Sequence, residues 1–237
     1  MSDFSIIRRC CRNRGLIRGV AAVSQVSFAE FLARTHRCAP IGEASMNRPG
    51  ISIVSGLPRS GTSMMMQMIA AGGVEPLIDG VRAPDPDNPK GYYEFERVKQ
   101  IKSDKSWLED AKGRVVKMVH LLLLDLPAIE GLDYSIIFMR RDLDEVLASQ
   151  AAMLKRLGRP AAPLPPAQLK SIYLKQIEQV YAHVSSRADM RLLEVQYKDV
   201  VEDPVKTASM LAQFLGGSMN TQAMSSAVDP TLYRNKA

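Results

Sequence analysis

The stretch "VSGLPRSGTSMMMQMI" (residues 54–69) places small and turn-forming residues between an apolar run and a helical pattern. A strand ending at Ser55, a loop from Gly56 to Gly61 and a helix beginning at Thr62 would direct several backbone N–H groups toward one point. Backbone N–H groups arranged in this way at a helix N-terminus bind anions, phosphates above all. We therefore predict an anion-binding loop between a strand and a helix.

The cation of this loop is not where a nucleotide hydrolase would have it. Against the pattern G-x-x-x-x-G-K-[ST], Gly56, Gly61 and Ser63 match, but Thr62 occupies the lysine position. Arg59 is the only cation in the loop. A turn that merely joins a strand to a helix is the alternative interpretation, but it leaves the run of small hydroxyl residues unexplained. The loop thus predicts an anion site that differs from that of an ATPase.

A magnesium-binding carboxylate is equally hard to find in the sequence. The segment "VHLLLLD" ends at Asp125 and resembles a Walker B strand. We instead expect the strand to end near Val119 and the leucines to form a buried helical turn. Without the loop lysine and this carboxylate, a kinase or ATPase lacks both of its electrophilic elements. A P-loop phosphotransferase is therefore the second hypothesis rather than the first.

Apolar, β-branched runs alternate with helical patterns along the rest of the chain. Continuous apolar runs typical of strands buried on both faces lie at 51–56, 114–119, 134–140 and 191–197. Helical patterns lie at 61–71, 94–106, 143–157, 166–187 and 204–215. The alternation predicts a three-layer α/β domain in which helices flank a central parallel sheet. Long loops expected at 79–93 and 158–168 would border the site.

Length and charge distribution indicate one domain with an appendage. The chain has 237 residues, 46% of them hydrophobic and 24% charged, which suffices for one well-buried domain. We expect this domain at 46–237 and a basic extension at 1–45. The extension carries seven arginines against Asp3, Glu30 and Glu43, a net charge of +4, whereas the rest of the chain is only +2. Because the body is nearly neutral, we expect no nucleic-acid partner.

The extension at 1–45 also holds all three cysteines, Cys10, Cys11 and Cys38. The rest of the chain has no thiol for a disulfide or a metal site, which favours a cytoplasmic location. No apolar run in the sequence reaches the roughly 18 residues of a membrane span. The extension has three interpretations: a disordered tail, a mis-assigned start upstream of Met46, or an Arg-rich targeting segment.

The segment "PRSGTS" (58–63) resembles the 5′-phosphosulfate loop of sulfotransferases that use 3′-phosphoadenosine 5′-phosphosulfate (PAPS). Loops of that family commonly read P-[KR]-S-G-T-[TS], with a Lys or Arg at the position of Arg59. The resemblance implies that this arginine stabilises the charge that develops on the leaving group during in-line transfer. It also implies that the residues binding the 5′ side of the nucleotide are Pro58, Arg59, Ser60, Gly61, Thr62 and Ser63.

Two further blocks resemble the same family, in the same order along the chain. In "IIFMRRDLDEVLASQ" (136–150), Arg141 at a strand end and Ser149 on the next helix have the spacing of the family's 3′-phosphate ligands. The block "LLEVQYKDVVEDPVKTASMLAQFLGG" (192–217) is similar to the family's C-terminal segment, although Lys198 stands where a glutamate is usual. An ordinary strand and amphipathic helix would explain the second block alone. Three blocks in register are a specific match.

The resemblance implies a P-loop NTPase-like fold and an enzyme that transfers a sulfuryl group from PAPS to a hydroxyl or amine without a metal ion. The acceptor would be a small molecule or a glycan; the sequence predicts neither its class nor the oligomeric state. The family's C-terminal R-K-G-x-x-G loop is missing, and Arg234 is either its substitute or a residue of a frayed tail. Three hypotheses remain: a sulfotransferase, a P-loop phosphotransferase, and a catalytically silent nucleotide-binding module.

The sequence leaves the catalytic base open between two residues. Many relatives carry K-x-H on the strand after the first crossover, where both side chains share a face. Here "KMVH" separates Lys117 from His120 by three positions, so on a regular strand they would face opposite sides. His120 reaches the site only if the strand ends at Val119, with Lys117 as a second cation at the leaving group. Glu94 in "KGYYEFE" (90–96) is the other candidate, since some bacterial and Golgi relatives use a glutamate.

Overall fold

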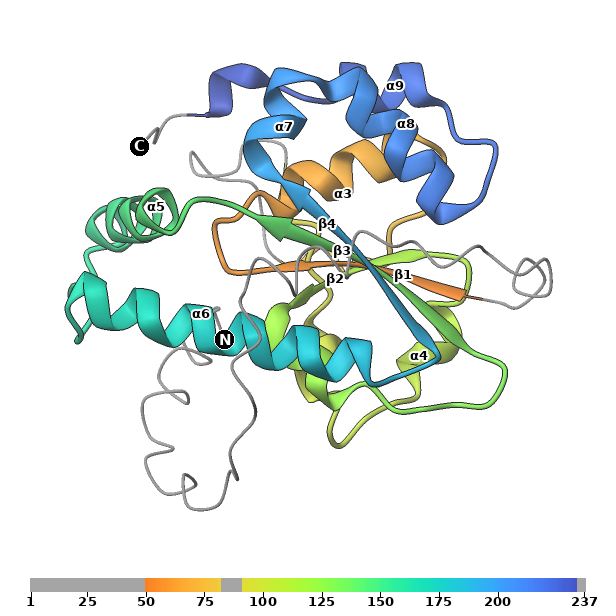
Figure 1. The fold of residues 1–237 in the computed structure, drawn as a ribbon, viewed down its shortest axis with the longest axis horizontal. Coiled ribbons are helices and arrows are strands. Elements are labelled where there is room, and N and C mark those ends of the chain that lie inside the picture. The colour runs from red at the N-terminus through yellow and green to blue at the C-terminus, as the bar shows by residue number, and fades with distance from the viewer. Residues whose placement is uncertain (1–49, 82–90, 234–237) are drawn as a thin grey trace. The chain divides into compact units, whose positions relative to one another are not determined.

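A parallel sheet forms the centre of the domain. The structure is a computed structural model that describes residues 50–81 and 91–233, which belong to one compact unit, Arg48–Ala237. The strands in this part of the chain are β1 (Gly50–Gly56), β2 (Val115–Val119), β3 (Asp133–Arg140) and β4 (Met190–Gln196). Their order is β2-β1-β3-β4, and all neighbours are parallel. The loop after β1 therefore emerges between two neighbouring strands (Figure 1).

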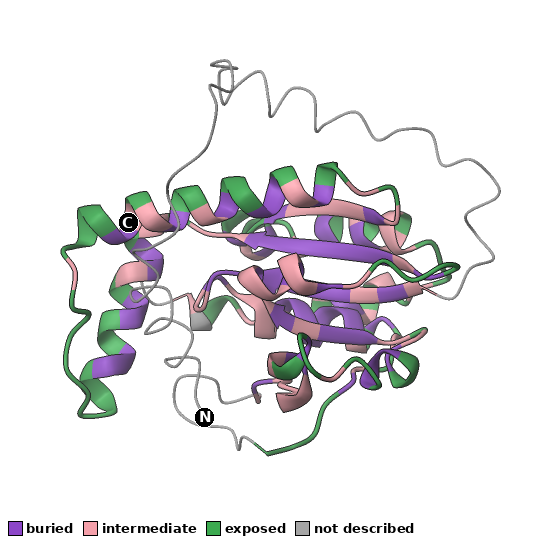
Figure 2. Cartoon of the chain, turned by 90° about the horizontal axis from the view of Figure 1, so that it is seen from below, coloured by how far each residue is buried: buried purple, intermediate pink, exposed green. Residues whose placement is uncertain are grey.

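Helices cover both faces of this sheet (Figure 1). One layer comprises α3 (Thr62–Ala71), α8 (Pro204–Leu215) and α9 (Thr221–Ser226), whose buried side chains form one cluster with strand residues such as Val54 and Ile137. On the other face lies α6 (Pro166–Ser185), where Tyr181 packs edge-on against Phe138 with ring centroids 5.2 Å apart. Figure 2 shows the strands largely buried between these layers and the exposed residues on the outer sides of the helices. The predicted three-layer α/β fold with a central parallel sheet is confirmed.

Most predicted elements form close to their expected boundaries. The four strands agree within one or two residues, and so do the helices α3, α5 (Leu143–Arg156), α6 and α8. The expected helical turn after the second strand is the 3-10 helix η3 (His120–Asp125). The sequence did not predict α7 (Tyr197–Glu202), α9 or the 3-10 helix η4 (Pro230–Leu232). The extension at 1–45, part of the loop at 79–93, and Arg234 lie outside the described residues.

The helix predicted at 94–106 is wrong. The chain forms a short 3-10 helix, η2 (Glu96–Gln100), then a turn, then the single-turn helix α4 (Trp107–Asp110). The turn is stabilised by Asp104, whose Oδ1 accepts hydrogen bonds from Ser106 N at 3.0 Å and Ser106 Oγ at 2.7 Å. Such bonds from a side chain to the nearby backbone compete with helical ones, and they interrupt the helix here.

Contacts made by α7 and α9 hold both ends of α3. At the start of α3, Tyr197 fills the space beside Gly61, where an added Cβ would lie 2.4 Å from Tyr197 Cδ2. At its end, Asn220 N donates a hydrogen bond to Gly72 O at 3.1 Å. A Cβ added to Gly72 would lie 2.8 Å from Met224 Sδ. The direction in which α3 points therefore depends on these later elements.

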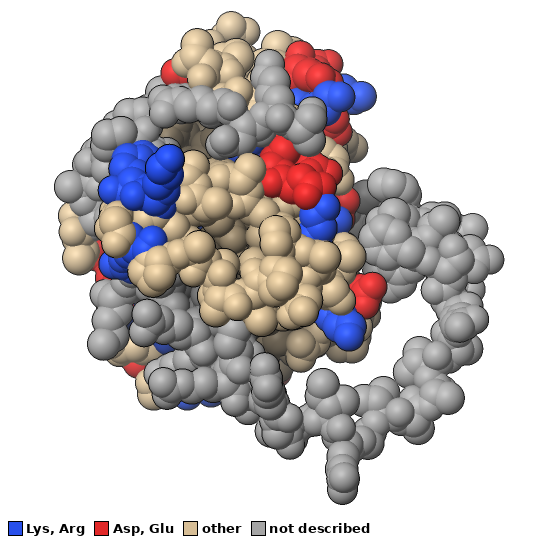
Figure 3. Space-filling view, turned by 90° about the vertical axis from the view of Figure 1, so that its left-hand side faces the viewer, with Lys and Arg blue, Asp and Glu red and all other residues tan. Residues whose placement is uncertain are grey.

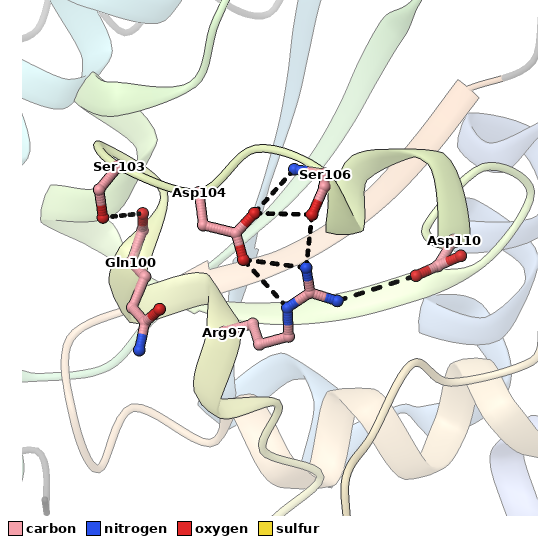
Figure 4. Close-up of polar contacts among 6 residues, drawn as sticks. All are labelled: Arg97, Gln100, Ser103, Asp104, Ser106 and Asp110. Atoms are coloured by element: carbon pink, nitrogen blue, oxygen red, sulfur yellow. Dashed lines mark hydrogen bonds and ion pairs between the residues drawn. The ribbon is translucent and has the colours of Figure 1, made fainter.

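A cluster of partly or fully exposed polar side chains holds the turn between η2 and α4 (Figure 4). Arg97 Nη2 donates to Asp104 Oδ2 at 2.9 Å and to Ser106 Oγ at 2.6 Å. Arg97 Nη1 lies 4.0 Å from Asp110 Oδ2. The hydrogen bond from the Ser106 side chain, followed by those from Arg97, lowers the pKa of Asp104 from 3.8 to about 2. Because the cluster is exposed, its effect on stability is small, and it depends on pH.

Replacing Asp104 by asparagine is expected to lower the Tm at neutral pH and to lose this effect in acid. A carboxylate whose pKa is depressed on folding stabilises the folded state above its unfolded pKa, here 3.8, and this stabilisation is lost as the pH falls toward the folded value of about 2. In calorimetric scans, the difference in Tm between the wild type and Asp104→Asn should therefore shrink from about pH 5 to about pH 2. A difference that stays constant over this range would contradict the assignment.

Candidate functional site

The loop between β1 and α3 has the geometry of an anion cradle. Gly56 and Gly61 have φ angles of 151° and 98°, which side chains rarely allow. A Cβ on Gly56 would lie 2.5 Å from Ser60 Oγ and 2.7 Å from Met139 O, so alanine does not fit. Ser60 N donates to Leu57 O at 3.1 Å and closes the turn. The first N–H groups of a helix have no acceptor inside it, so α3 adds donors and the positive end of its dipole.

Two residues of the loop, Arg59 and Ser60, have features typical of a ligand site. Arg59 has a φ of 77°, in the left-handed region, which costs about 1–3 kcal/mol in a residue other than glycine. Ser60 is 1% exposed, and its Oγ has no hydrogen-bond partner within residues 50–81 and 91–233. A buried hydroxyl left unpaired is unfavourable, and an anionic oxygen in the cradle would accept its hydrogen bond. The loop therefore fits a phosphate or phosphosulfate group.

The predicted loop residues lie together, and they contact the second sequence block. Arg59 Nε donates to Ser149 Oγ at 3.0 Å, and Arg141 Nη1 donates to Arg59 O at 3.3 Å. Gln150 Nε2 donates to Pro58 O at 3.0 Å. The structure thus brings together the residues that the sequence placed on the 5′ and 3′ sides of one nucleotide. Of the other predicted loop residues, Thr62 and Ser63 form the first turn of α3.

Arg141 is held on several sides. Its Nε donates to Glu145 Oε2 at 2.8 Å, and the two side chains are only 8% and 6% exposed. Its guanidinium carbon lies 4.5 Å from the ring centroid of Tyr197 and 5.4 Å from that of Tyr233. Tyr233 OH in turn donates to Glu145 Oε1 at 2.6 Å. A guanidinium held between a carboxylate and two aromatic rings has a fixed orientation.

Lys117 and Glu94, two predicted catalytic residues, form a partly buried ion pair. Lys117 Nζ lies 3.6 Å from Glu94 Oε1, and the side chains are 13% and 11% exposed. Lys117 Nζ also donates to Tyr92 O and lies 3.5 Å from Ser63 Oγ. Because Ser63 belongs to the first turn of α3, the pair lies at the same end of this helix as the anion loop. Glu94 precedes η2 in a segment without regular secondary structure and does not begin a helix.

His120 points toward α6 on the other face of the sheet. Its side chain is buried, and Nε2 lies 2.9 Å from Gln176 Oε1. An amide oxygen only accepts, so Nε2 is the donor in this contact. Nδ1 is buried without a hydrogen-bond partner in the described part of the chain. Burial lowers the pKa of His120, and the contacts with Gln176 and with the backbone of Gly56 oppose this shift. The described contacts do not bring His120 together with Lys117.

Three residues of the site were not predicted from the sequence. Glu145 follows Arg141 by four positions, a helical spacing that places side chains next to each other and that could have identified the pair. Gln150 contacts the loop and accepts a hydrogen bond from Tyr173 OH at 2.9 Å. Tyr233 lies 88 positions from its partner Glu145. For Gln150 and Tyr233 the sequence carries no local signal.

The surface around α5 carries charges of both signs, and Asp144 forms an ion pair with Lys170. This helix carries Asp144 and Glu145 in its first turn and Lys155 and Arg156 in its last. Figure 3 shows a face on which the described residues are mainly uncharged and on which several acidic groups lie directly beside basic ones. The described part of this face has no continuous basic stripe, which agrees with the nearly neutral charge of the chain body. Within residues 50–81 and 91–233, no helix has the length and apolar character needed to cross a membrane.

A protein-family model described as the sulfotransferase family matches residues 95–220, more than half of the chain. Among solved structures, the sulfotransferase domain of an olefin synthase from Synechococcus PCC 7002 matches with a TM-score of 0.48 and 16% identity, covering 79% of this chain and 86% of that one. A Mycobacterium tuberculosis sulfotransferase gives a TM-score of 0.47 and 16% identity, covering 78% of this chain and 73% of that one. A mouse sulfotransferase complexed with PAP gives 0.45 and 16%, covering 79% and 64%. No curated protein matches significantly.

The chain belongs to the sulfotransferase family. It is an enzyme of that class, and the phosphotransferase alternative is not favoured. The matched segment contains Arg141 and Ser149 as well as Lys117 and His120. The anion loop precedes this segment and is joined to it by the contact between Arg59 and Ser149.

Proposed function

We propose that this sulfotransferase uses PAPS as its co-substrate and sulfates a hydroxyl or amine of a small molecule or glycan. When bound, PAPS supplies an activated sulfuryl group on a nucleotide that also carries a 3′-phosphate. The observation that carries the proposal is the contact between the two blocks, in which Arg59 donates to Ser149 and Arg141 donates to the backbone of Arg59. Two anion subsites in contact suit a nucleotide with phosphate groups at both its 5′ and 3′ positions.

Each part of the site has a defined role in this proposal. The backbone N–H groups of the loop and the unpaired hydroxyl of Ser60 hold the 5′ side of the nucleotide. Arg141 and Ser149 hold the 3′-phosphate through charge-assisted and neutral hydrogen bonds. Arg59 and Lys117 stabilise the negative charge that grows on the leaving oxygen. Because these cations and the α3 N-terminus supply the positive potential, we propose that transfer needs no metal ion.

We propose Glu94 as the base that takes the proton from the acceptor. Its carboxylate lies beside Lys117 at the loop end of α3. The competing candidate, His120, is buried and contacts Gln176 of α6 through Nε2. A base must come within hydrogen-bond reach of the proton that it removes, and the ion pair with Lys117 holds Glu94 at the loop end of α3.

The acceptor site is proposed to lie next to Glu94. Asp79 N donates to Glu94 O at 3.2 Å, so the segment of 77–81 runs beside the proposed base. This segment exposes Ile78 and Val81, which are 47% and 72% exposed.

We also propose a cytoplasmic location, since residues 46–237 contain no cysteine for a disulfide.

Calorimetric titration with adenosine 3′,5′-bisphosphate, AMP and ATP tests the nucleotide assignment. Charge-assisted hydrogen bonds contribute roughly 1.5–3 kcal/mol and neutral ones about 1 kcal/mol, so Arg141 and Ser149 should favour the bisphosphate over AMP by about 10²- to 10³-fold. This preference should hold without magnesium and be lost in Arg141→Ala.

The neighbouring arginine provides the matched control for this titration. Arg140 Nη1 lies 4.0 Å from Glu194 Oε2, at the end of the same strand. Arg140→Ala removes one arginine from the same strand end, and we expect it to keep the preference for the bisphosphate. A preference of the wild type for magnesium-ATP over the bisphosphate would refute the use of PAPS and restore the phosphotransferase hypothesis.

A further inference from the structure

Tyr233, the last residue that the structure describes, belongs to the cluster around Arg141. Its phenol donates to Glu145 Oε1, and its ring meets that of Tyr197 edge-on, with centroids 5.1 Å apart and an interplanar angle of 80°. The 3-10 helix η4 leads directly to it, and the side chain of Asp229 caps this helix by accepting from Thr231 N at 3.1 Å. Tyr233 therefore has defined partners on α5 and at the start of α7.

Glu145 connects this tyrosine to the arginine. One carboxylate oxygen accepts from Tyr233 and the other from Arg141 Nε. The guanidinium is planar, so fixing its Nε also fixes the direction of its Nη groups, one of which donates to the anion loop at Arg59 O. Without the phenol, the buried carboxylate loses one of its donors and is held less firmly. The direction of Arg141 would then no longer be fixed.

The charge of Glu145 gives a second reason for the phenol. A buried carboxylate beside an anion subsite repels the ligand, and a hydrogen bond to it withdraws part of its charge. A phenol is protonated at neutral pH and can donate, and the hydrogen bond to Glu145 raises the pKa of Tyr233 further, to about 12. The phenol would therefore favour binding of an anion by Arg141 in two ways. It keeps the guanidinium directed, and it reduces the repulsion between Glu145 and the anion.

We propose that Tyr233 is a positioning residue of the 3′-phosphate subsite: it fixes Glu145, and Glu145 in turn directs Arg141 at the phosphate. The inference rests on the proposed function, since the 3′-phosphate is the group assigned to Arg141. It makes the segment of 230–233 part of the nucleotide site, although this segment follows all three sequence blocks.

The variant Tyr233→Phe tests the proposal, because it keeps the ring and removes only the hydroxyl. In calorimetric titrations of the full chain, the affinity for adenosine 3′,5′-bisphosphate should fall about tenfold, the weakening expected when one charge-assisted contact is misdirected. The affinity for AMP should change by less than about twofold, since AMP has no 3′-phosphate. The selectivity for the bisphosphate over AMP should therefore fall about tenfold.

A matched tyrosine separates positioning from a general structural effect. Tyr134 OH donates to Pro127 O at 2.9 Å, beside the amino end of β3 and away from Arg141. Tyr134→Phe loses a comparable hydrogen bond, and its selectivity should equal that of the wild type. A double-mutant cycle adds a second test: Tyr233→Phe combined with Glu145→Gln should be no less selective than Glu145→Gln alone, because the phenol acts through this carboxylate.

The outcomes distinguish the two levels of the proposal. If the wild type does not prefer the bisphosphate to AMP, the assignment of PAPS fails and the role of Tyr233 fails with it. If the wild type has this preference and Tyr233→Phe keeps it, only the role of Tyr233 is refuted. The role of Tyr233 would also be refuted if Tyr233→Phe lowered the selectivity for the bisphosphate over AMP by the same factor in the Glu145→Gln background as in the wild type.

Discussion

Replacing Glu94 with glutamine is expected to lower kcat by about 10²- to 10⁴-fold, the contribution of a positioned general base. Glutamine has nearly the same shape but does not accept a proton at neutral pH. The contacts of Lys117 with Tyr92 O and Ser63 Oγ do not involve this carboxylate, so the affinity for adenosine 3′,5′-bisphosphate should stay within about threefold of the wild type. Transfer of radiolabelled sulfate from PAPS to a panel of alcohols, phenols and amines measures the loss.

His120→Ala provides the comparison for this experiment. We expect its kcat to stay within about tenfold of the wild type and its Tm to fall, because the change removes a buried ring and the partner of Gln176. Glu75→Gln, which alters an exposed ion pair with Arg114, is the control for a change of charge. Loss of transfer in His120→Ala, with full activity in Glu94→Gln, would assign the base to the histidine. Full activity in both variants would exclude both residues.

Arg59→Ala is expected to lower kcat by about 10²-fold or more, as the loss of one preorganised electrostatic stabiliser does. The hydrogen bond to Ser149 directs the side chain of Arg59. The backbone of Arg59 has a left-handed conformation that belongs to the turn of the anion loop. Arg59→Lys keeps the charge but loses the Nε–H that reaches Ser149, so it should recover only part of the rate. The same radiolabelled transfer assay compares the variants at saturating PAPS.

Arg114→Ala is the matched control for the loss of an arginine. Arg114 Nη2 lies 3.1 Å from Glu75 Oε1, just before β2, at the amino end of the sheet. Its removal should leave kcat unchanged. An unchanged kcat in Arg59→Ala would exclude Arg59 as the stabiliser of the leaving group.

The sheet was predictable because the signal for a buried parallel strand is local and continuous. The runs at 51–56 and 134–140 are apolar on both faces, and both became strands close to their expected limits. The helix predicted at 94–106 failed because the side chain of Asp104 accepts a hydrogen bond from Ser106 N, and this contact competes with helical backbone hydrogen bonds. A hydrophobic pattern alone does not show whether a polar side chain will compete with the backbone hydrogen bonds of a helix.

The site was predictable where its parts follow one another in the chain. The anion loop and the spacing of Arg141 and Ser149 are local features, and the structure brings them into contact. The pairing of Lys117 with Glu94 depends on how the segment before η2 returns to β2, which no spacing encodes. Tyr233 lies 88 positions after Glu145 in the sequence, so only the folded structure reveals the contact between them.

The contacts that hold α3 determine when the anion loop is completed during synthesis. Tyr197 fills the space beside Gly61, and Met224 fills the space beside Gly72. Both residues are translated more than a hundred residues after the loop. A chain still on the ribosome therefore has its glycine-rich loop long before the side chains that fix it. We expect nascent chains to bind no nucleotide until residue 224 has left the exit tunnel. On this expectation the nucleotide binds only after the later elements have packed against α3, so it would not assist the folding of the first half of the domain.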